Sequence, residues 1–172
     1  MHVLEKLDSC GAIPITVSDS KGYLLDEDGF DYMKISLIRD IKLQQKSLRE
    51  YLKSNPRAKY FEDAKPWSER SDIAFPCASQ NKIDHPDAIA LVNSGCRVLV
   101  EGSNMPCTPQ AIDILRKAKV LVAPAKAASA GGCYAFGDPS SVLIACKIAL
   151  VHGGNICAFL NIAHAMIDQG CV

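Results

Sequence analysis

Apolar and polar positions alternate along the first part of the chain in patterns that predict helices and strands in turn. Residues 2–10 place apolar side chains at helical spacing and end before Gly11, a typical position for a helix C-terminus. Residues 12–18 read "AIPITVS" and predict a strand. Residues 19–31 carry acids and two glycines and predict a loop rich in turns, whereas residues 31–54 predict a helix with one strongly charged side.

The pattern becomes more regular after residue 70. Short apolar runs at 71–78, 96–103 and 119–125 predict buried strands, and the segments 85–95 and 108–118 between them predict helices. Strands that alternate with helices of about ten residues indicate β-α-β units. The sequence therefore predicts an α/β fold with a doubly wound, Rossmann-like parallel sheet.

Residues that typically begin or end helices support these helix boundaries. Pro86 stands near the first position of one helix and Gly95 follows its end. Thr108 is placed to cap the next helix, with Pro109 at its first position. These residues favour helix starts and stops at the places that the apolar pattern indicates.

The last part of the chain is apolar but interrupted. A membrane-spanning helix needs about 20 uninterrupted apolar residues. Residues 140–170 are broken by Lys147, His152, Gly153 and Asn155, so we expect two C-terminal helices packed on the sheet instead. His152, Cys157 and His164 stand at spacings more typical of packing than of a metal site, and no metal is expected.

Composition removes several classes of function. The 172 residues suit one domain. The 19 basic and 19 acidic residues cancel, so the net charge does not indicate binding to nucleic acid or to a membrane surface. The charged start of the chain does not resemble a secretory signal. The eight cysteines form no C-x-x-C pair, so we expect free thiols in the cytoplasm or another reducing compartment.

Three polar segments follow predicted strands, and ligands of open parallel sheets bind at such strand ends. They are Ser18-Asp19-Ser20-Lys21, Cys77-Ala78-Ser79-Gln80-Asn81 and Glu101-Gly102-Ser103-Asn104. A carboxylate there can accept ribose hydroxyls, serines with a lysine can hold a 2′-phosphate, and an asparagine suits a carboxamide such as that of nicotinamide. The alternative is that these are ordinary loops in which Asn104 and Thr108 only cap helices.

Long motifs make the chain recognisable. "KYFEDAKPWSERSDIAFPCASQN", "VEGSNMPCTPQAIDILRKAKVLVAPAKAASAGG" and "AMIDQG" resemble NADP-type glutamate dehydrogenase in its nucleotide-binding domain, and "VSDSKGYLLDEDGFD" is similar to the plant and algal branch. The resemblance implies oxidative deamination of glutamate to 2-oxoglutarate and ammonia, or the reverse, with NADP or NAD. It implies that Ser18, Asp19, Ser20 and Lys21 lie near the adenosine ribose and its phosphate. It places Ala78, Ser79 and Gln80 by the nicotinamide ribose and Asn104 at the carboxamide.

The same resemblance shows what this sequence lacks. The family's glycine-rich turn and the strand before it belong ahead of residue 1, and the substrate domain with its catalytic lysine and aspartate is absent, so no catalytic residue is assigned. After Gly132 the segment "CYAFGDPSS" departs from the family. We expect residues 1–132 to form a partial, incomplete dinucleotide-binding domain and residues 133–172 to form a C-terminal helical segment.

Two functions remain open at this point. The chain is the nucleotide-binding part of an NADP-dependent glutamate dehydrogenase, or it is a catalytically inactive remnant that binds nucleotide weakly or docks onto full-length subunits. Its expected partners are a nicotinamide dinucleotide and further subunits, in a homo-oligomer or with full-length chains. Because the central strand is missing, "IPITVS" and "SDIAFP" should each have an unpaired edge that favours association.

Overall fold

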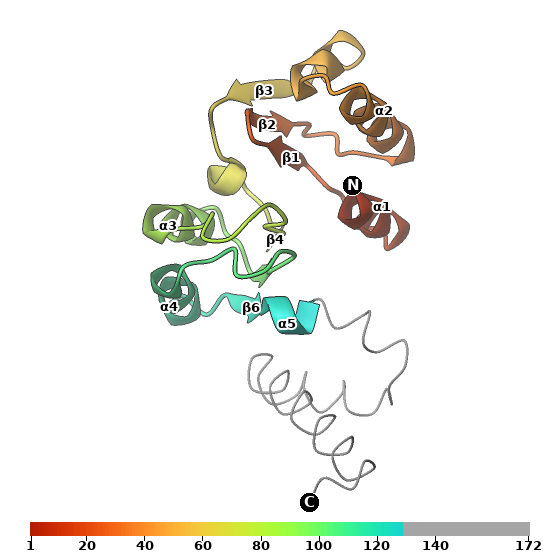
Figure 1. Cartoon of the computed structure of the whole chain (residues 1–172). Coiled ribbons are helices and arrows are strands. Elements are labelled where there is room, and N and C mark those ends of the chain that lie inside the picture. Colours follow the sequence, from red (N-terminus) through yellow and green to blue (C-terminus); the bar gives the residue numbers. More distant parts are fainter. Residues whose placement is uncertain (129–172) are drawn as a thin grey trace, which may run out of the picture. The chain divides into compact units, whose positions relative to one another are not determined.

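A computed structural model describes residues 1–128 of the chain (Figure 1). These residues divide into two compact units, the first covering Met1–Glu69 and the second beginning at Arg70. Each unit has its own sheet of three strands. The predicted C-terminal helices within residues 133–172 lie outside the described residues. The described part confirms an α/β protein with a small parallel sheet and helices.

The sheet of the first unit is antiparallel. Strand β1 (Thr16–Asp19) pairs with β2 (Gly22–Leu25), and β2 pairs with β3 (Lys59–Glu62). Asp19 is the partner of Gly22, so only two residues connect β1 and β2 in a tight hairpin. All four residues of β2 are buried, because it is the central strand.

Strand β2 corrects the prediction of a loop over residues 19–31. Its four residues lie between turn residues on both sides, and a run this short carries little periodic signal of its own. It becomes a strand because β1 and β3 supply hydrogen-bonding partners on both of its edges. Strand β3 was not predicted either, since its ends are the charged residues Lys59 and Glu62.

The helices of the first unit are shorter than predicted. They are α1 (His2–Ser9), α2 (Tyr32–Leu43) and the 3-10 helices η1 (Leu48–Lys53) and η2 (Pro66–Ser68). The single helix predicted over residues 31–54 is wrong because the chain turns after α2. Gln45 has a positive φ of 55°, and the Lys46 amide donates to the Ile41 carbonyl at 3.0 Å, which is a Schellman-type helix end.

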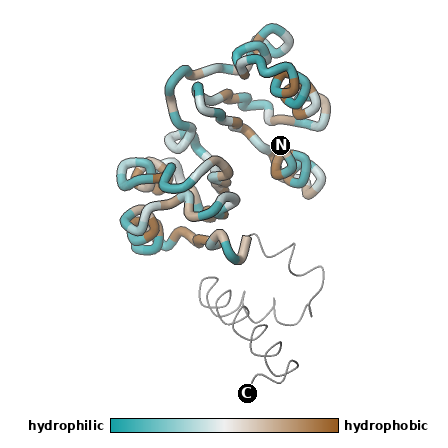
Figure 2. The backbone as a smooth tube through the Cα atoms, viewed as in Figure 1, coloured by the Kyte–Doolittle hydropathy of each residue, from teal (hydrophilic) through white to brown (hydrophobic). Residues whose placement is uncertain are grey.

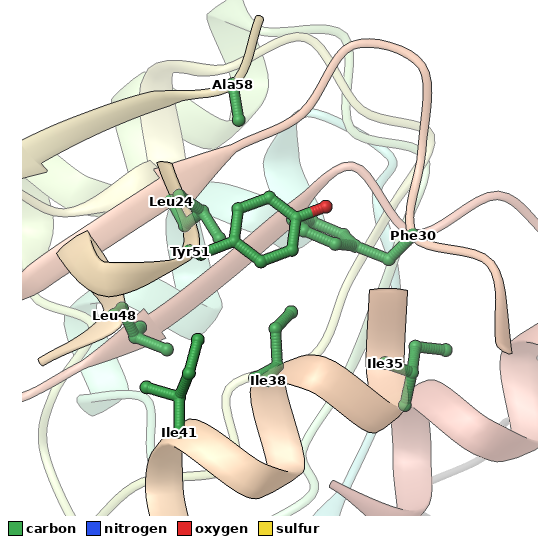
Figure 3. Close-up of a cluster of buried hydrophobic side chains, with 8 residues drawn as sticks. All are labelled: Leu24, Phe30, Ile35, Ile38, Ile41, Leu48, Tyr51 and Ala58. Atoms are coloured by element: carbon green, nitrogen blue, oxygen red, sulfur yellow. The ribbon is translucent and has the colours of Figure 1, made fainter. Parts of the chain in front are cut away.

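One face of α2 packs on the sheet and on η1. Figure 3 shows Ile38 and Ile41 pointing from α2 toward Tyr51 and Leu24, and Ile35 lies on the same helix below Phe30. The spacing of three residues keeps these isoleucines on one side of the helix, and Figure 2 shows hydrophilic positions between apolar ones along α2. Phe30, Leu48 and Ala58 complete this hydrophobic cluster.

A polar group lies beside that cluster. Asp26 is 3% exposed, and its carboxylate accepts hydrogen bonds from the Tyr51 hydroxyl at 2.8 Å and pairs with the Lys34 ammonium at 2.9 Å. Burial raises the pKa of Asp26, but the hydrogen bonds from Lys34 and Tyr51 and the lysine charge outweigh burial and hold it below its usual value of 3.8. Asp26 is therefore a buried charge with a cation beside it.

The second unit has the predicted parallel arrangement. Strands β4 (Ile73–Ala74), β5 (Val98–Val100) and β6 (Leu121–Ala123) lie in that order, with parallel pairing throughout. The helices are α3 (His85–Asn93), α4 (Pro109–Lys117) and the short α5 (Ala125–Ala128). Helices α3 and α4 pack together on one side of these strands (Figure 1).

The residues predicted to begin and end helices are confirmed in that role. Thr108 caps α4 by accepting the Ala111 amide at 3.3 Å, and Pro86 and Pro109 stand in the first turns of α3 and α4. Gly95 follows α3 with a φ of 88°. Helix α1 ends as expected as well, since Gly11 adopts a φ of 76° directly after it.

The two faces of the parallel sheet differ in exposure. Ala74, Leu99 and Val122 are paired across the strands and all are buried. On the other face, Ile73 and Leu121 are 43% and 55% exposed. Among the described residues, β1 and β4 each have a neighbouring strand on one side only. No helix within residues 1–128 has the length and apolarity that crossing a membrane requires.

Candidate functional site

The first group of predicted site residues lies at the tip of the β1–β2 hairpin. Ser18 and Asp19 end β1, and Ser20 and Lys21 form the connection to β2. The Asp19 carboxylate accepts the Lys21 amide at 2.9 Å, which fixes the turn. Ser18, Ser20 and Lys21 are exposed. Within residues 1–128 no hydrogen bond or ion pair of the exposed Lys21 ammonium is seen, although its charge acts on Asp19.

A second cation joins this tip and was not predicted from the sequence. The Lys42 ammonium from the last turn of α2 lies 2.8 Å from the other Asp19 oxygen. Burial raises the pKa of Asp19, but the hydrogen bonds and charges of Lys42 and Lys21 outweigh burial and hold it below 3.8. Asp19 stays ionised, and two lysines offset its charge. Lys42 is 23 residues from Asp19, so only the packing of α2 reveals it.

The hairpin tip is fastened to β3. The Lys21 carbonyl accepts the Asp63 amide at 2.9 Å and the Tyr60 hydroxyl at 3.2 Å. Gly22 adopts a φ of 148°, and a Cβ there would lie 2.1 Å from the Phe61 carbonyl oxygen. A glycine is therefore required for the close approach of β2 to β3 beside the tip.

The second group lies on two loops that follow adjacent parallel strands. Residues 76–83 follow β4 and residues 102–108 follow β5. Their backbones are joined by four hydrogen bonds: Gly102 amide to Pro76 carbonyl at 3.2 Å, Asn81 amide to Met105 carbonyl at 3.0 Å, Ile83 amide to Pro106 carbonyl at 2.9 Å, and Thr108 amide to Ile83 carbonyl at 3.0 Å. The predicted residues Ala78, Ser79, Gln80 and Asn104 are all exposed on these joined loops.

A close contact at the base of the loops explains the glycine after Glu101. A Cβ on Gly102 would lie 2.4 Å from the Cys77 Sγ. The Ser103 hydroxyl donates to the Pro76 carbonyl at 3.4 Å nearby. The two loops therefore start as close together as their atoms permit.

The described residues supply hydrogen-bonding groups and cations rather than a metal site. The structure brings Ala78, Ser79, Gln80 and Asn104 together in the second unit, and Ser18 to Lys21 together in the first. Asn104 offers both amide donors and an acceptor, and the hairpin offers hydroxyls and ammonium groups. Within residues 1–128, no group of three His, Cys, Asp or Glu side chains is placed to hold a metal ion. The four cysteines described there are free thiols.

Comparison with known proteins assigns a family to this arrangement. The family model for Glutamate/Leucine/Phenylalanine/Valine dehydrogenase matches residues 1–137. The chain is 36% identical over 204 aligned residues to glutamate dehydrogenase of Bacteroides thetaiotaomicron, covering 99% of this chain and 46% of the relative. It is 46% identical over 132 residues to NADP-specific glutamate dehydrogenase of a Psychrobacter species, covering 77% of this chain and 29% of the relative.

Solved structures agree. The structure of Plasmodium falciparum glutamate dehydrogenase 2 matches with a TM-score of 0.85 and 36% identity, covering 99% of this chain and 45% of that protein. The chain thus spans less than half the length of these relatives.

Proposed function

Because the chain belongs to the glutamate, leucine, phenylalanine and valine dehydrogenase family, we propose that it is the nucleotide-binding portion of an NADP-dependent glutamate dehydrogenase. In such an enzyme the nicotinamide cofactor accepts or donates hydride as glutamate and 2-oxoglutarate with ammonia interconvert. The task of these residues is to bind and orient that cofactor.

The pairing of the two loops is the observation that carries this proposal. Ala78, Ser79 and Gln80 lie on one loop and Asn104 on the other, and the loops are joined through Asn81 and Met105. They leave adjacent parallel strands at their carboxyl ends, where open α/β sheets bind ligands. The Ser79 hydroxyl and Gln80 amide suit a ribose, and the Asn104 side chain suits a carboxamide.

The hairpin tip supports a preference for the phosphorylated cofactor. A bare carboxylate at the end of a strand favours unphosphorylated ribose and repels a 2′-phosphate. Here the Lys42 ammonium neutralises Asp19 at 2.8 Å, while the Lys21 ammonium has no such partner within residues 1–128. Two hydroxyls and two cations around one carboxylate suit NADP, and NAD should bind more weakly.

Calorimetry of the whole chain with NADP⁺, NAD⁺ and 2′,5′-ADP tests the proposal. Lys21→Ala should weaken NADP⁺ and 2′,5′-ADP about tenfold and leave NAD⁺ within about twofold, because the lost contact is with a phosphate. Asn104→Ala should weaken NADP⁺ and NAD⁺ alike and spare 2′,5′-ADP. Lys59→Ala is the matched control, since this exposed lysine stands at the other end of the same sheet and pairs with Glu27. Equal binding of NADP⁺ and NAD⁺ by the parent would contradict the phosphate assignment.

The chain should show no glutamate dehydrogenase turnover by itself. General acid–base groups typically contribute about 10²–10⁴-fold to a rate, and none is assigned in this sequence. Placing substrate against cofactor contributes a further large factor that these residues do not provide. The measurement is NADPH formation from glutamate at 340 nm, with an intact glutamate dehydrogenase as reference. Turnover at a rate comparable to the reference would overturn this expectation.

The second candidate function is an inactive chain that docks onto other subunits, and the open strand edges favour it. Strands β1 and β4 each present one edge without a neighbour among the described residues, and Ile73 on β4 is 43% exposed. Such edges pair readily with another chain. We expect purified protein to be aggregated, partly molten or oligomeric in light scattering coupled to gel filtration, and Ile73→Lys to reduce association. A monodisperse monomer with a sharp cooperative thermal transition would exclude this function.

A further inference from the structure

Glu101 is a buried carboxylate at the base of the paired loops, and it differs from the other buried acid. Asp26 and Glu101 are 3% and 7% exposed, and they are the buried charged side chains of the described residues. Asp26 pairs with the Lys34 ammonium. None of the ion pairs among residues 1–128 includes Glu101. Burying a carboxylate without a cation costs free energy unless hydrogen bonds satisfy its oxygens.

Glu101 contacts the segment at the end of β6 and lies near the far end of the loop that follows β5. Its carboxylate accepts the Ala125 amide, just after β6, at 3.0 Å. Its backbone amide donates to the Ala123 carbonyl at 3.0 Å. The Cys107 thiol, which is 5% exposed and stands at the far end of the loop, lies close enough to this carboxylate for the Glu101 charge to raise its pKa. Glu101 therefore joins the end of β5 to the segment after β6 and lies beside the end of the loop.

Cys107 extends this connection to the neighbouring loop. It forms a parallel bridge with Ile83, whose amide and carbonyl bond to Pro106 and Thr108. Burial, followed by the Glu101 carboxylate, raises the pKa of the Cys107 thiol to about 12. The thiol thus keeps its proton at neutral pH and remains able to donate a hydrogen bond to Glu101. A continuous path of contacts runs from Glu101 through Cys107 and Ile83 to the loop that carries Ala78 to Gln80.

We propose that Glu101 is a positioning residue for the nicotinamide half of the cofactor, acting through Cys107 to set the separation of the two loops. The proposal rests on the function proposed above. Because Glu101 is only 7% exposed, it acts on Asn104 and on Ala78 to Gln80 by fixing the backbone rather than by touching the ligand. The segment between Glu101 and Cys107, which contains Asn104, begins at the bond of Glu101 to Ala125 and ends at the bridge of Cys107 with Ile83.

Binding experiments on the full chain separate positioning from general stability. Glu101→Ala should weaken NADP⁺ about tenfold and leave 2′,5′-ADP within about twofold, because 2′,5′-ADP has no nicotinamide half for the paired loops to hold. Glu101→Gln keeps an acceptor oxygen and should restore most of the affinity. Cys107→Val fills the space without a donor and should resemble Glu101→Ala, whereas Cys107→Ser keeps a donor and should resemble the parent. Equal loss of both ligands, or no loss in Glu101→Ala and Cys107→Val, would overturn the proposal.

Hydrogen exchange tests the same inference without any ligand. In Glu101→Ala, the amides of Asn81 and Ile83 should exchange at least about tenfold faster, because they bond to the opposite loop. The Leu121 amide, which bonds to Arg97 at the other end of the strands, should keep the parent's rate. Uniform acceleration at all three amides would mean a purely structural role and reject positioning. If the parent binds no dinucleotide, the proposed function fails, while this exchange pattern still decides whether Glu101 joins the loops.

Discussion

The hairpin tip of residues 1–69 and the paired loops of residues 70–128 hold their exposed polar groups by different means. At the tip, side-chain charges do the holding: Asp19 accepts from Lys42 and from the Lys21 amide. On the loops, backbone groups do it, with Gly102, Asn81 and Ile83 donating to the opposite loop. The tip should therefore respond to pH and salt, whereas the loops should respond to changes in backbone spacing.

The hydrophobic cores of the two units differ in how completely they are buried. The first unit has a central strand with all four residues buried and a cluster built around Ile38 and Tyr51, which are 0% exposed. The second unit buries Leu99 completely on one face of its sheet, but Ile73 and Leu121 on the other face remain about half exposed. Parallel sheets normally have both faces covered. The first unit should therefore carry more stability of its own than residues 70–128 do.

Core truncation should give the largest effect and tests that difference directly. Ile38→Ala should lower the free energy of unfolding of the first unit by about 2–5 kcal/mol, since it leaves a cavity in a closed cluster. Leu99→Ala should lower that of the second unit by about 2 kcal/mol, because the strands can relax where Ile73 and Leu121 are about half exposed. Hydrogen exchange of the amides in each unit measures both. If either substitution destabilises the two units equally, they unfold together and the comparison fails.

Removing the buried charge of the first unit should give an intermediate effect that depends on pH. Asp26→Asn should cost about 2–3 kcal/mol at pH 7, because the Lys34 ammonium loses its anion. The pKa of Asp26 is lowered in the folded protein, so its stabilisation is complete above the usual value of 3.8 and is lost as the pH falls through the lower folded value. The difference in free energy of unfolding between parent and variant, measured by urea denaturation, should therefore be constant near neutrality and disappear at acidic pH.

Asp28→Asn provides the matched control for that experiment. Its side chain is 62% exposed and lies 3.8 Å from Arg57, so the change should alter the free energy of unfolding by at most about 1 kcal/mol. A control as destabilising as Asp26→Asn would show that burial is not the cause.

Substitution of Gly22 beside the hairpin tip, or of Gly102 at the base of the paired loops, should lower the stability least and sharpen the contrast between the units. Gly22→Ala should cost about 1–3 kcal/mol, because its Cβ meets the backbone oxygen of Phe61, which cannot move alone. Gly102→Ala meets only the Cys77 side chain, so it should cost about 1 kcal/mol. Adding Cys77→Ala should remove most of the Gly102→Ala effect in thermal melts. Absence of this rescue would place the strain in the loop backbone.

The sequence predicted the parallel unit well because its signals are local. Thr108, Pro109 and Gly95 mark helix ends within one turn, and the strands between are continuous apolar runs. The antiparallel unit was predicted less well because its signals are distant. Strand β2 is a strand through its pairing with β3, whose first residue, Lys59, lies 37 residues after Gly22, the first residue of β2.

The site followed the same division. The position of Ala78 to Gln80 and of Asn104 after adjacent strands could be predicted because they directly follow apolar runs, whereas their role toward a cofactor stays a prediction. Lys42 could not, because it reaches Asp19 only when α2 packs across the sheet. Glu101 was visible at its strand end, but no sequence pattern shows that its carboxylate turns inward to Ala125 and Cys107.

The two-residue connection between Asp19 and Gly22 restricts which insertions and deletions this region can tolerate. Side chains alternate across a strand with a period of two, so one added residue would either form a bulge or turn each side chain of β2 to the opposite face of the sheet. Because all four residues of β2 are buried, this reversal would place new side chains against β1, β3 and α2. Homologues whose turn differs in length would have to rebuild the contacts of Lys21 and Lys42 together, and cofactor preference should change most readily along with such length changes.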